Sequence, residues 1–85
     1  MTYEVILSQQ ADNYFARLPR DVARRVVEVL KALESNPKPP GAMPLTGVFR
    51  GLYRMRVGGL RIVYNPNPAH GRIRVVSILP RGDAY

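Results

Sequence analysis

Three arginines occupy one face of a predicted β-hairpin, and their spacing suits the binding of an anion. Segment 50–64 contains two runs of alternating apolar and polar residues joined by the glycine pair 58–59, the pattern of a hairpin with a two-residue turn. In this register Arg56 lies opposite Arg61, and Arg54 shares their face. Like charges in direct cross-strand positions repel each other. We therefore expect a phosphate or another anion to bind on this face.

The opposite face of the predicted hairpin is apolar and is assigned to the hydrophobic core. Successive side chains of a strand point to opposite faces, so the residues between the arginines point the other way. A hairpin of this kind needs a packed layer against its apolar face and water or a ligand against its basic face. The apolar face comprises Tyr53, Met55, Val57, Leu60, Ile62 and Tyr64.

The N-terminal part of the chain is predicted to supply the packed layer as two helices. Residues 3–7 are expected to form an opening strand, and Ser8 is a suitable N-cap for the first helix. Asp21 is a suitable cap for the second helix, which the Asn-Pro pair at 36–37 ends. Each helix has one apolar stripe at helical spacing. The stripes comprise Ala11, Tyr14, Phe15 and Leu18 in the first helix and Val22, Val26, Val29, Leu30 and Leu33 in the second.

The C-terminal part is predicted to consist of strands separated by irregular segments. Four prolines in 37–44 remove backbone donors, so this segment is expected to be an irregular connector. Residues 65–71 are expected to form a turn, and residues 72–79 alternate as a last strand. The predicted order is β-α-α-β-β-β within a single domain, residues 1–85. The fold class is α+β, with two N-terminal helices packed on an antiparallel sheet that the first strand returns to join.

The chain is short, basic and free of cysteine. Its 85 residues carry a formal net charge of +7, of which residues 43–85 contribute +6 through seven arginines and one acid. A basic half rich in arginine points to nucleic acid or to an acidic protein as the partner. The lack of cysteine excludes a disulfide framework and a thiolate metal site. Since the sequence has no membrane-spanning apolar run and no visible signal peptide, we expect a cytoplasmic protein that does not bind membranes.

Two stretches of this sequence resemble the RelE/ParE superfamily of small bacterial toxins. The first is Leu-Thr-Gly at 45–47 followed by the arginine-rich segment 49–64, which is similar to the family's L-x-G motif and its alternating basic strands. The second, residues 77–85, is similar to the ending of the RelE branch, in which an arginine precedes a tyrosine by four positions. The resemblance covers nearly the whole chain and implies a single RelE-like microbial ribonuclease domain.

Members of the RelE branch are ribosome-dependent ribonucleases that cut mRNA, so the resemblance implies a toxin of a type II toxin–antitoxin system with that activity. The reaction is attack of a ribose 2′-hydroxyl on the adjacent phosphate, and it requires no metal or other cofactor. The implied partners are the ribosome with its mRNA and a cognate antitoxin, acidic and partly disordered when free. The resemblance implies Arg61, Arg81 and Tyr85 for catalysis and Arg54 and Arg56 for RNA binding. We add Arg50 and Arg74 to the predicted RNA-binding residues, Arg74 as a peripheral phosphate contact or a solvent-side charge.

Two departures from the family pattern bear on the mechanism. Some relatives have lysine at the positions of Arg54 and Arg56, and lysine can act as a base whereas arginine stays protonated. Pro80 stands where many relatives have histidine. The sequence therefore leaves three sources of base catalysis open: the ribosome's RNA, Tyr85, or electrostatic stabilisation without a dedicated base. Two other functions fit the same fold and charge, a ParE-type inhibitor of DNA gyrase and a non-catalytic module that binds RNA or the ribosome.

Overall fold

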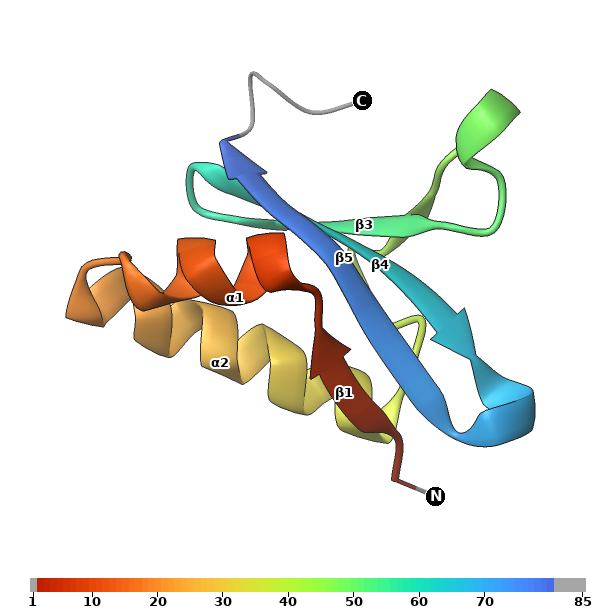
Figure 1. Ribbon diagram of the computed structural model, residues 1–85. Helices are drawn as coiled ribbons and strands as arrows, with labels where there is room; N and C mark the ends of the chain where they lie inside the picture. Colours follow the sequence, from red (N-terminus) through yellow and green to blue (C-terminus); the bar gives the residue numbers. More distant parts are fainter. Residues whose placement is uncertain (1, 81–85) are drawn as a thin grey trace.

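Two helices pack against one face of a five-stranded sheet, as Figure 1 shows. The computed structural model describes residues 2–80. The predicted α+β class is confirmed. No helix within residues 2–80 is long and apolar enough to cross a bilayer. The elements are β1 (Glu4–Leu7), α1 (Gln9–Ala16), α2 (Arg20–Ser35), β2 (Met43–Pro44), the 3-10 helix η1 (Gly47–Phe49), β3 (Tyr53–Val57), β4 (Leu60–Asn67), the 3-10 helix η2 (Pro68–His70) and β5 (Arg72–Pro80).

The sheet is mixed, whereas the sequence predicts an antiparallel one. Its strand order is β1-β5-β4-β3-β2, and β1 joins β5 in parallel, with Glu4 opposite Arg72 and Leu7 opposite Val75. The other neighbouring strands are antiparallel. Parallel strands need a long connection between them. Here the two helices and the strands from β2 to β4 form that connection, so the first strand returns to the sheet as expected but with the opposite direction.

Two short segments that the sequence predicts to be irregular belong to the sheet. Met43–Pro44 forms β2 beside β3, at the edge of the sheet, where a proline is tolerated. Residues 65–67 extend β4 beside β5, so the turn between these strands is shorter than predicted. Because β3 pairs with β4 only as far as Tyr64, the strand has a neighbour on one side at Pro66. Pro66 has no backbone N–H, but no hydrogen bond to β3 is lost, because β3 does not extend this far.

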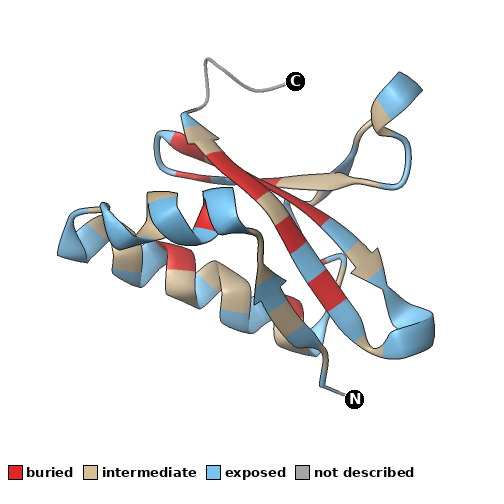
Figure 2. Cartoon of the chain, viewed as in Figure 1, coloured by how far each residue is buried: buried red, intermediate tan, exposed pale blue. Residues whose placement is uncertain are grey.

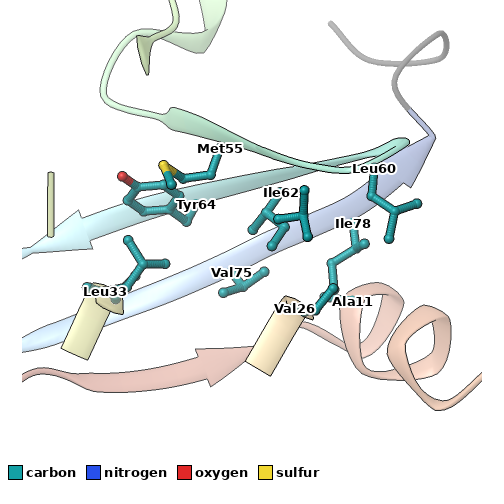
Figure 3. Close-up of a cluster of buried hydrophobic side chains, with 11 residues drawn as sticks. Ala11, Val26, Leu33, Met55, Leu60, Ile62, Tyr64, Val75 and Ile78 are labelled. Atoms are coloured by element: carbon teal, nitrogen blue, oxygen red, sulfur yellow. The ribbon is translucent and has the colours of Figure 1, made fainter. Parts of the chain in front are cut away.

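The hydrophobic core fills the space between the helices and the sheet. Ala11 of α1 and Val26 and Leu33 of α2 are fully buried, and Figure 3 shows them in one cluster with side chains of the central strands. In Figure 2 the buried residues concentrate on the central strands and on the helix sides toward them. Both predicted helical stripes and the whole apolar face of the hairpin contribute to this cluster, which confirms that part of the sequence analysis. Full burial of one aliphatic side chain contributes about 1.5–3 kcal/mol.

Ser8 caps the first helix as predicted, whereas Asp21 does not cap the second. The Oγ atom of Ser8 accepts a hydrogen bond from the N–H of Ala11 at 3.1 Å. Pro19 occupies the N-cap position of α2 without a side-chain hydrogen bond, and Asp21 lies in the first turn. A carboxylate in the first turn still stabilises a helix, because the N-terminal end carries partial positive charge. The second helix thus begins two residues earlier than an aspartate cap implies.

Beyond the point where β1 stops pairing with β5, the side chains of Ser8 and Gln10 form hydrogen bonds with the backbone of β5. The register between β4 and β5 shifts there, leaving Val76 as an extra residue on β5. The Oγ atom of Ser8 donates to the carbonyl oxygen of Val76 at 2.6 Å. The Gln10 amide donates to the carbonyl oxygen of Ile78 at 3.0 Å and accepts from the Ile78 N–H at 3.1 Å. Gln10 therefore pairs with β5 in the way that a neighbouring strand would.

Candidate functional site

The β3–β4 hairpin has the predicted register and presents arginines on the face away from the helices. Val57 pairs with Leu60 across a two-residue turn, and Arg56 lies directly opposite Arg61. Directly opposed residues of antiparallel strands have Cβ atoms about 5 Å apart. Arg54 precedes Arg56 by two positions and therefore shares its face. Hereafter the surface formed by Arg54, Arg56 and Arg61 is called the arginine face.

The turn of this hairpin is supported from α2. Gly58 has a φ of +57°, a left-handed conformation that glycine adopts without strain, whereas Gly59 does not have a positive φ. Glycine in the first of the two turn positions is typical of a type II′ turn. A Cβ atom at position 58 would lie 3.3 Å from Nη1 of Arg25, so this α2 side chain packs closely against the turn. The helix layer thus helps to fix the tip of the hairpin beside the arginine face.

The three arginines combine partial burial with access from outside. Arg56 is exposed, whereas Arg54 and Arg61 are half-buried. Arg54 and Arg56 line a surface hollow together with Pro40 and Met43. Within residues 2–80, no carboxylate lies at ion-pair distance from Arg54. Its positive charge is therefore available to an anion that enters the hollow.

Two tyrosines on the inner face hold the strands of the hairpin from behind. The rings of Tyr53 and Tyr64 are stacked, with centroids 5.9 Å apart. The Tyr64 hydroxyl donates to the carbonyl oxygen of Pro37 at 2.9 Å. Burial, with a smaller effect from Tyr53, raises the pKa of Tyr64 to about 12. Lys38 places its Nζ atom 5.2 Å from the centroid of the Tyr53 ring, an attractive cation–π contact. Together these contacts tie the proline-rich connector to the hairpin.

The other predicted site residues lie apart from the arginine face or outside the described residues. Arg50 is exposed and follows η1, which projects from the sheet in Figure 1. Arg74 is on the open face of β5 and pairs with Asn65, which lies on β4 two positions from the partner of Arg54 and four positions from Arg61. Arg81 and Tyr85 lie outside the described residues. Arg74 thus lies on the same side of the sheet as the arginine face but at its periphery, and its predicted role in RNA binding stays a prediction.

Two asparagines near Arg74 were missed by the sequence analysis. Asn65 and Asn67 are exposed on the extended end of β4 and line a hollow with Arg74. Their spacing of two residues continues the alternation of β4 and is the signal that reveals them. The surrounding prolines favour a turn instead and obscure this signal.

Comparison with known families decides the family of this chain. Residues 5–85 match the family described as "ParE toxin of type II toxin-antitoxin system, parDE". The chain belongs to this toxin family. Among curated proteins, Toxin RelE of Mycobacterium tuberculosis (strain ATCC 25618 / H37Rv) is 33% identical over 84 residues, which cover 98% of this chain and 86% of that protein.

Solved structures of RelE-type toxins share the fold of this ParE-family toxin. A chain of the archaeal RelE–RelB complex from Pyrococcus horikoshii OT3 is 32% identical, with a TM-score of 0.81, and the match covers 99% of this chain and 100% of that one. The isolated Escherichia coli RelE toxin is 19% identical, with a TM-score of 0.79, over 92% of this chain and 83% of that one. At this lower identity the likeness concerns the fold alone.

In this toxin, the arginine face offers positive charge and hydrogen-bond donors but no general base. Each guanidinium has five N–H donors in a planar fork that fits the oxygens of a phosphate. Donors fixed in advance stabilise a phosphate best when it gains negative charge in a transition state. Arginine does not release its proton at physiological pH. Of the residues described, His70 belongs to η2 and Lys38 to the connector, so neither is part of the arginine face.

Proposed function

We propose that this toxin-family member is a ribosome-dependent endoribonuclease that cuts mRNA and thereby inhibits translation. The proposal is carried by the arginine face, in which Arg56 and Arg61 stand directly opposite each other with Arg54 beside them. Its likeness to RelE toxins, at 32–33% identity over almost the whole chain, supports the same branch of the family. An arrangement of like charges on an accessible strand face is most easily understood as a site for a polyanion.

The proposed reaction is an internal transfer of the phosphate. The ribose 2′-oxygen attacks the adjacent phosphorus, and the bond from phosphorus to the 5′-oxygen breaks. A proton leaves the 2′-hydroxyl and another reaches the 5′-oxygen, which gives a 2′,3′-cyclic phosphate and a free 5′-hydroxyl. Arg61, together with Arg81, stabilises the additional negative charge at phosphorus. Arg54 and Arg56 hold the flanking backbone in place.

The base in this reaction is proposed to come from outside the arginine face. Arg54 and Arg56 occupy positions where some relatives have lysine, and arginine stays protonated. Tyr64 is on the buried side of β4, its hydroxyl donates a hydrogen bond to the carbonyl oxygen of Pro37, and burial raises its pKa to about 12. It is therefore unsuited to accept a proton at neutral pH. The remaining candidates are Tyr85, the RNA of the ribosome, which would explain dependence on the ribosome, and electrostatic stabilisation without a dedicated base.

We further propose that a cognate antitoxin neutralises this toxin by covering its basic surface. The family description names a toxin–antitoxin system, and the archaeal relative was solved as a complex of RelE with RelB. The net charge of +7 favours an acidic partner. A partner that is disordered when free can wrap a large surface of so small a domain.

The purified toxin in a reconstituted translation system with a defined mRNA tests the ribonuclease proposal. Primer extension would map new 5′ ends in the message, with and without ribosomes. We expect cuts within codons that appear only on translated message and are lost with Arg61→Ala. Arg24→Ala, which removes one exposed charge from α2, is the matched control and should cut like the unaltered protein. Intact message would contradict the proposal.

Inhibition of DNA gyrase is the second candidate function, because the matching family is described as ParE toxin. A supercoiling assay with purified gyrase separates the two. Inhibition of supercoiling without mRNA cleavage would assign the protein to the ParE branch. Tight binding to ribosomes without either activity would indicate the non-catalytic module.

A further inference from the structure

The open face of the sheet has a second polar hollow at the end remote from the hairpin turn. It is lined by side chains of β1, β4 and β5. In Figure 1 this end of β4 and β5 lies next to η2, and in Figure 2 it is largely exposed. We call this hollow the distal hollow. Its lining residues are Ile6, Asn65, Asn67, Arg72 and Arg74.

Strand register explains why these side chains converge. Arg74 lies between Asn65 on β4 and Ile6 on β1, and Arg72 lies opposite Asn67. Directly opposed residues point to the same face of a sheet. The neighbouring positions on β1 and β5 are packed against the core, so the lining residues point away from it. The distal hollow is thus a consequence of the paired strands and needs no movement of a loop.

The charges of the distal hollow leave one guanidinium available. Arg72 Nε lies 3.5 Å from a carboxylate oxygen of Glu4, and both side chains are more than half exposed. In the part of the chain from 2 to 80, Arg74 has no carboxylate at ion-pair distance. Arg74 therefore offers a planar fork of donors to an anion, while Glu4 partly offsets Arg72.

The two asparagines add hydrogen-bonding groups of both kinds. Each amide has donor N–H groups and an acceptor oxygen. The Asn67 Oδ1 atom lies 3.3 Å from Nδ1 of His70, which restrains that amide. Ile6 is 44% exposed and gives the hollow an apolar patch. Phosphate, base edges and the apolar face of a ribose or base would find complementary groups here, as single-stranded RNA requires.

The distal hollow and the arginine face lie on the same side of β4. Arg61 and Asn65 are four residues apart on this strand, or about 13 Å at 3.3 Å per residue. Val63 lies between them on the same side of β4 and is fully buried, so an RNA strand that contacts Arg61 would pass over this covered position to reach Asn65. An acidic peptide would use the same arginines, and its backbone N–H and C=O groups can pair with the asparagine amides, so the choice of RNA over a peptide follows from the proposed function.

We propose that the distal hollow is a second RNA-binding subsite, which holds a nucleotide away from the position of cleavage through Arg74, Asn65 and Asn67. The inference rests on the proposed function for the nature of the ligand. It assigns Arg74 to positioning RNA, separately from the arginine face, and adds the two asparagines that the sequence motifs do not contain.

Binding measured without cleavage tests the subsite independently of the ribonuclease proposal. The probe is a fluorescently labelled single-stranded RNA of 12 nucleotides, and its anisotropy is followed against protein concentration at several salt concentrations. We expect Arg74→Ala to weaken binding about fivefold or more and to reduce the slope of log K against log salt by about 1. Arg24→Ala removes the same charge from α2 and should change the affinity less than about twofold.

An isosteric exchange tests the asparagines. Asn65→Asp places a negative charge in the distal hollow without changing its shape, and we expect binding to weaken about tenfold. Asn13→Asp introduces the same charge on α1, where the side chain accepts a hydrogen bond from Gln9, and serves as the control. Thermal unfolding followed by circular dichroism should be the same for both variants. Equal affinities of Asn65→Asp and Asn13→Asp for RNA would overturn the proposal.

The source of the RNA is resolved by a second titration with ribosomes that carry no message. If Arg74→Ala weakens binding to vacant ribosomes, the subsite holds ribosomal RNA. If it weakens binding only when message is present, the subsite holds mRNA. If the unaltered protein does not cut mRNA but Arg74→Ala still weakens RNA binding, the ribonuclease proposal alone is rejected. Unchanged RNA binding with intact cleavage would reject the subsite alone.

Discussion

The two faces of the β3–β4 hairpin are built from alternate residues of the same strands, but they serve different purposes. The inner face carries Ile62 and Tyr64, which are fully buried between the sheet and the helices. The outer face carries Arg56 and Arg61, which are paired across the strands and reachable from outside. Neighbouring residues such as Arg61 and Ile62 therefore report on separate properties. A substitution on the inner face should therefore alter stability, whereas a substitution on the outer face should alter activity.

The difference between the faces depends on one register. A slip of one residue would turn the arginines toward the core and the apolar side chains toward water. The glycine turn at 58–59 sets this register, and Arg25 packs against it from α2. The four predictions below test whether the faces are as separable as their geometry implies.

The largest effect is expected from Ile62→Asp on the inner face. An unpaired carboxylate would be buried in the core, which costs more than about 4 kcal/mol and approaches the whole stability of a domain of this size. Urea unfolding followed by circular dichroism measures the loss. Asn65→Asp introduces the same residue on the outer face of the same strand and should cost less than about 0.5 kcal/mol. Similar losses in the two variants would show that the faces are not separable.

Arg61→Ala should have the next largest effect, on activity and not on folding. Loss of one fixed donor to a transition state costs about 10²–10³ in rate. The free energy of unfolding should change by about 1 kcal/mol or less, since the side chain is only half-buried. Single-turnover cleavage of ribosome-bound message and urea unfolding give the two values. A variant that cuts normally would remove Arg61 from the catalytic site.

Ser8→Ala tests the contact between the helix layer and the sheet. This substitution removes the N-cap of α1 and the hydrogen bond to the Val76 carbonyl. We expect a loss of about 1–2 kcal/mol in stability. Cleavage under native conditions should be unchanged, because neither group belongs to the arginine face. Ser35→Ala at the last residue of α2 is a control with no capping role.

Tyr64→Phe should have the smallest effect at neutral pH and a distinctive one in alkali. Loss of the hydrogen bond to Pro37 costs about 1 kcal/mol. Because burial raises the pKa of folded Tyr64 to about 12, against 10.0 when unfolded, its contribution is complete below pH 10 and is lost as the pH rises toward 12. Urea unfolding should therefore show the difference between the two proteins falling by up to about 1.4 kcal/mol per pH unit above pH 10, so that it vanishes within about one unit and then reverses in favour of Tyr64→Phe. A constant difference would place the Tyr64 hydroxyl in water.

The hairpin, the apolar stripes of the helices and the start of α1 could be predicted because residues close together in the sequence determine them. Alternation around the glycine pair gave the hairpin register, the arginine face and the apolar face. Helical spacing gave both stripes, and Ser8 gave the start of α1. These features depend on neighbours within a few positions, where sterics and periodicity leave little choice.

Features that depend on distant segments were not predicted. The parallel direction of β1 is set by its pairing with β5, more than sixty residues away in the sequence. The prolines of β2 and β4 predict irregular structure from sequence alone. A strand tolerates them here because Pro44 lies at the edge of the sheet and Pro66 lies beyond the end of β3. The distance between Arg74 and the arginine face follows from the extension of β4 and the extra residue at Val76. Pairing between strands, and not the composition of either strand, decides these points.

The glutamine at the start of α1 has a consequence for the free protein. Beyond Val75, no strand within residues 2–80 lies beside one edge of β5, and an unpaired strand edge is a template for association with another chain. Gln10 satisfies both backbone groups of Ile78, and Pro80 lacks an N–H to offer. A side-chain amide thus occupies the backbone groups with which a strand of a second chain would otherwise pair at this position.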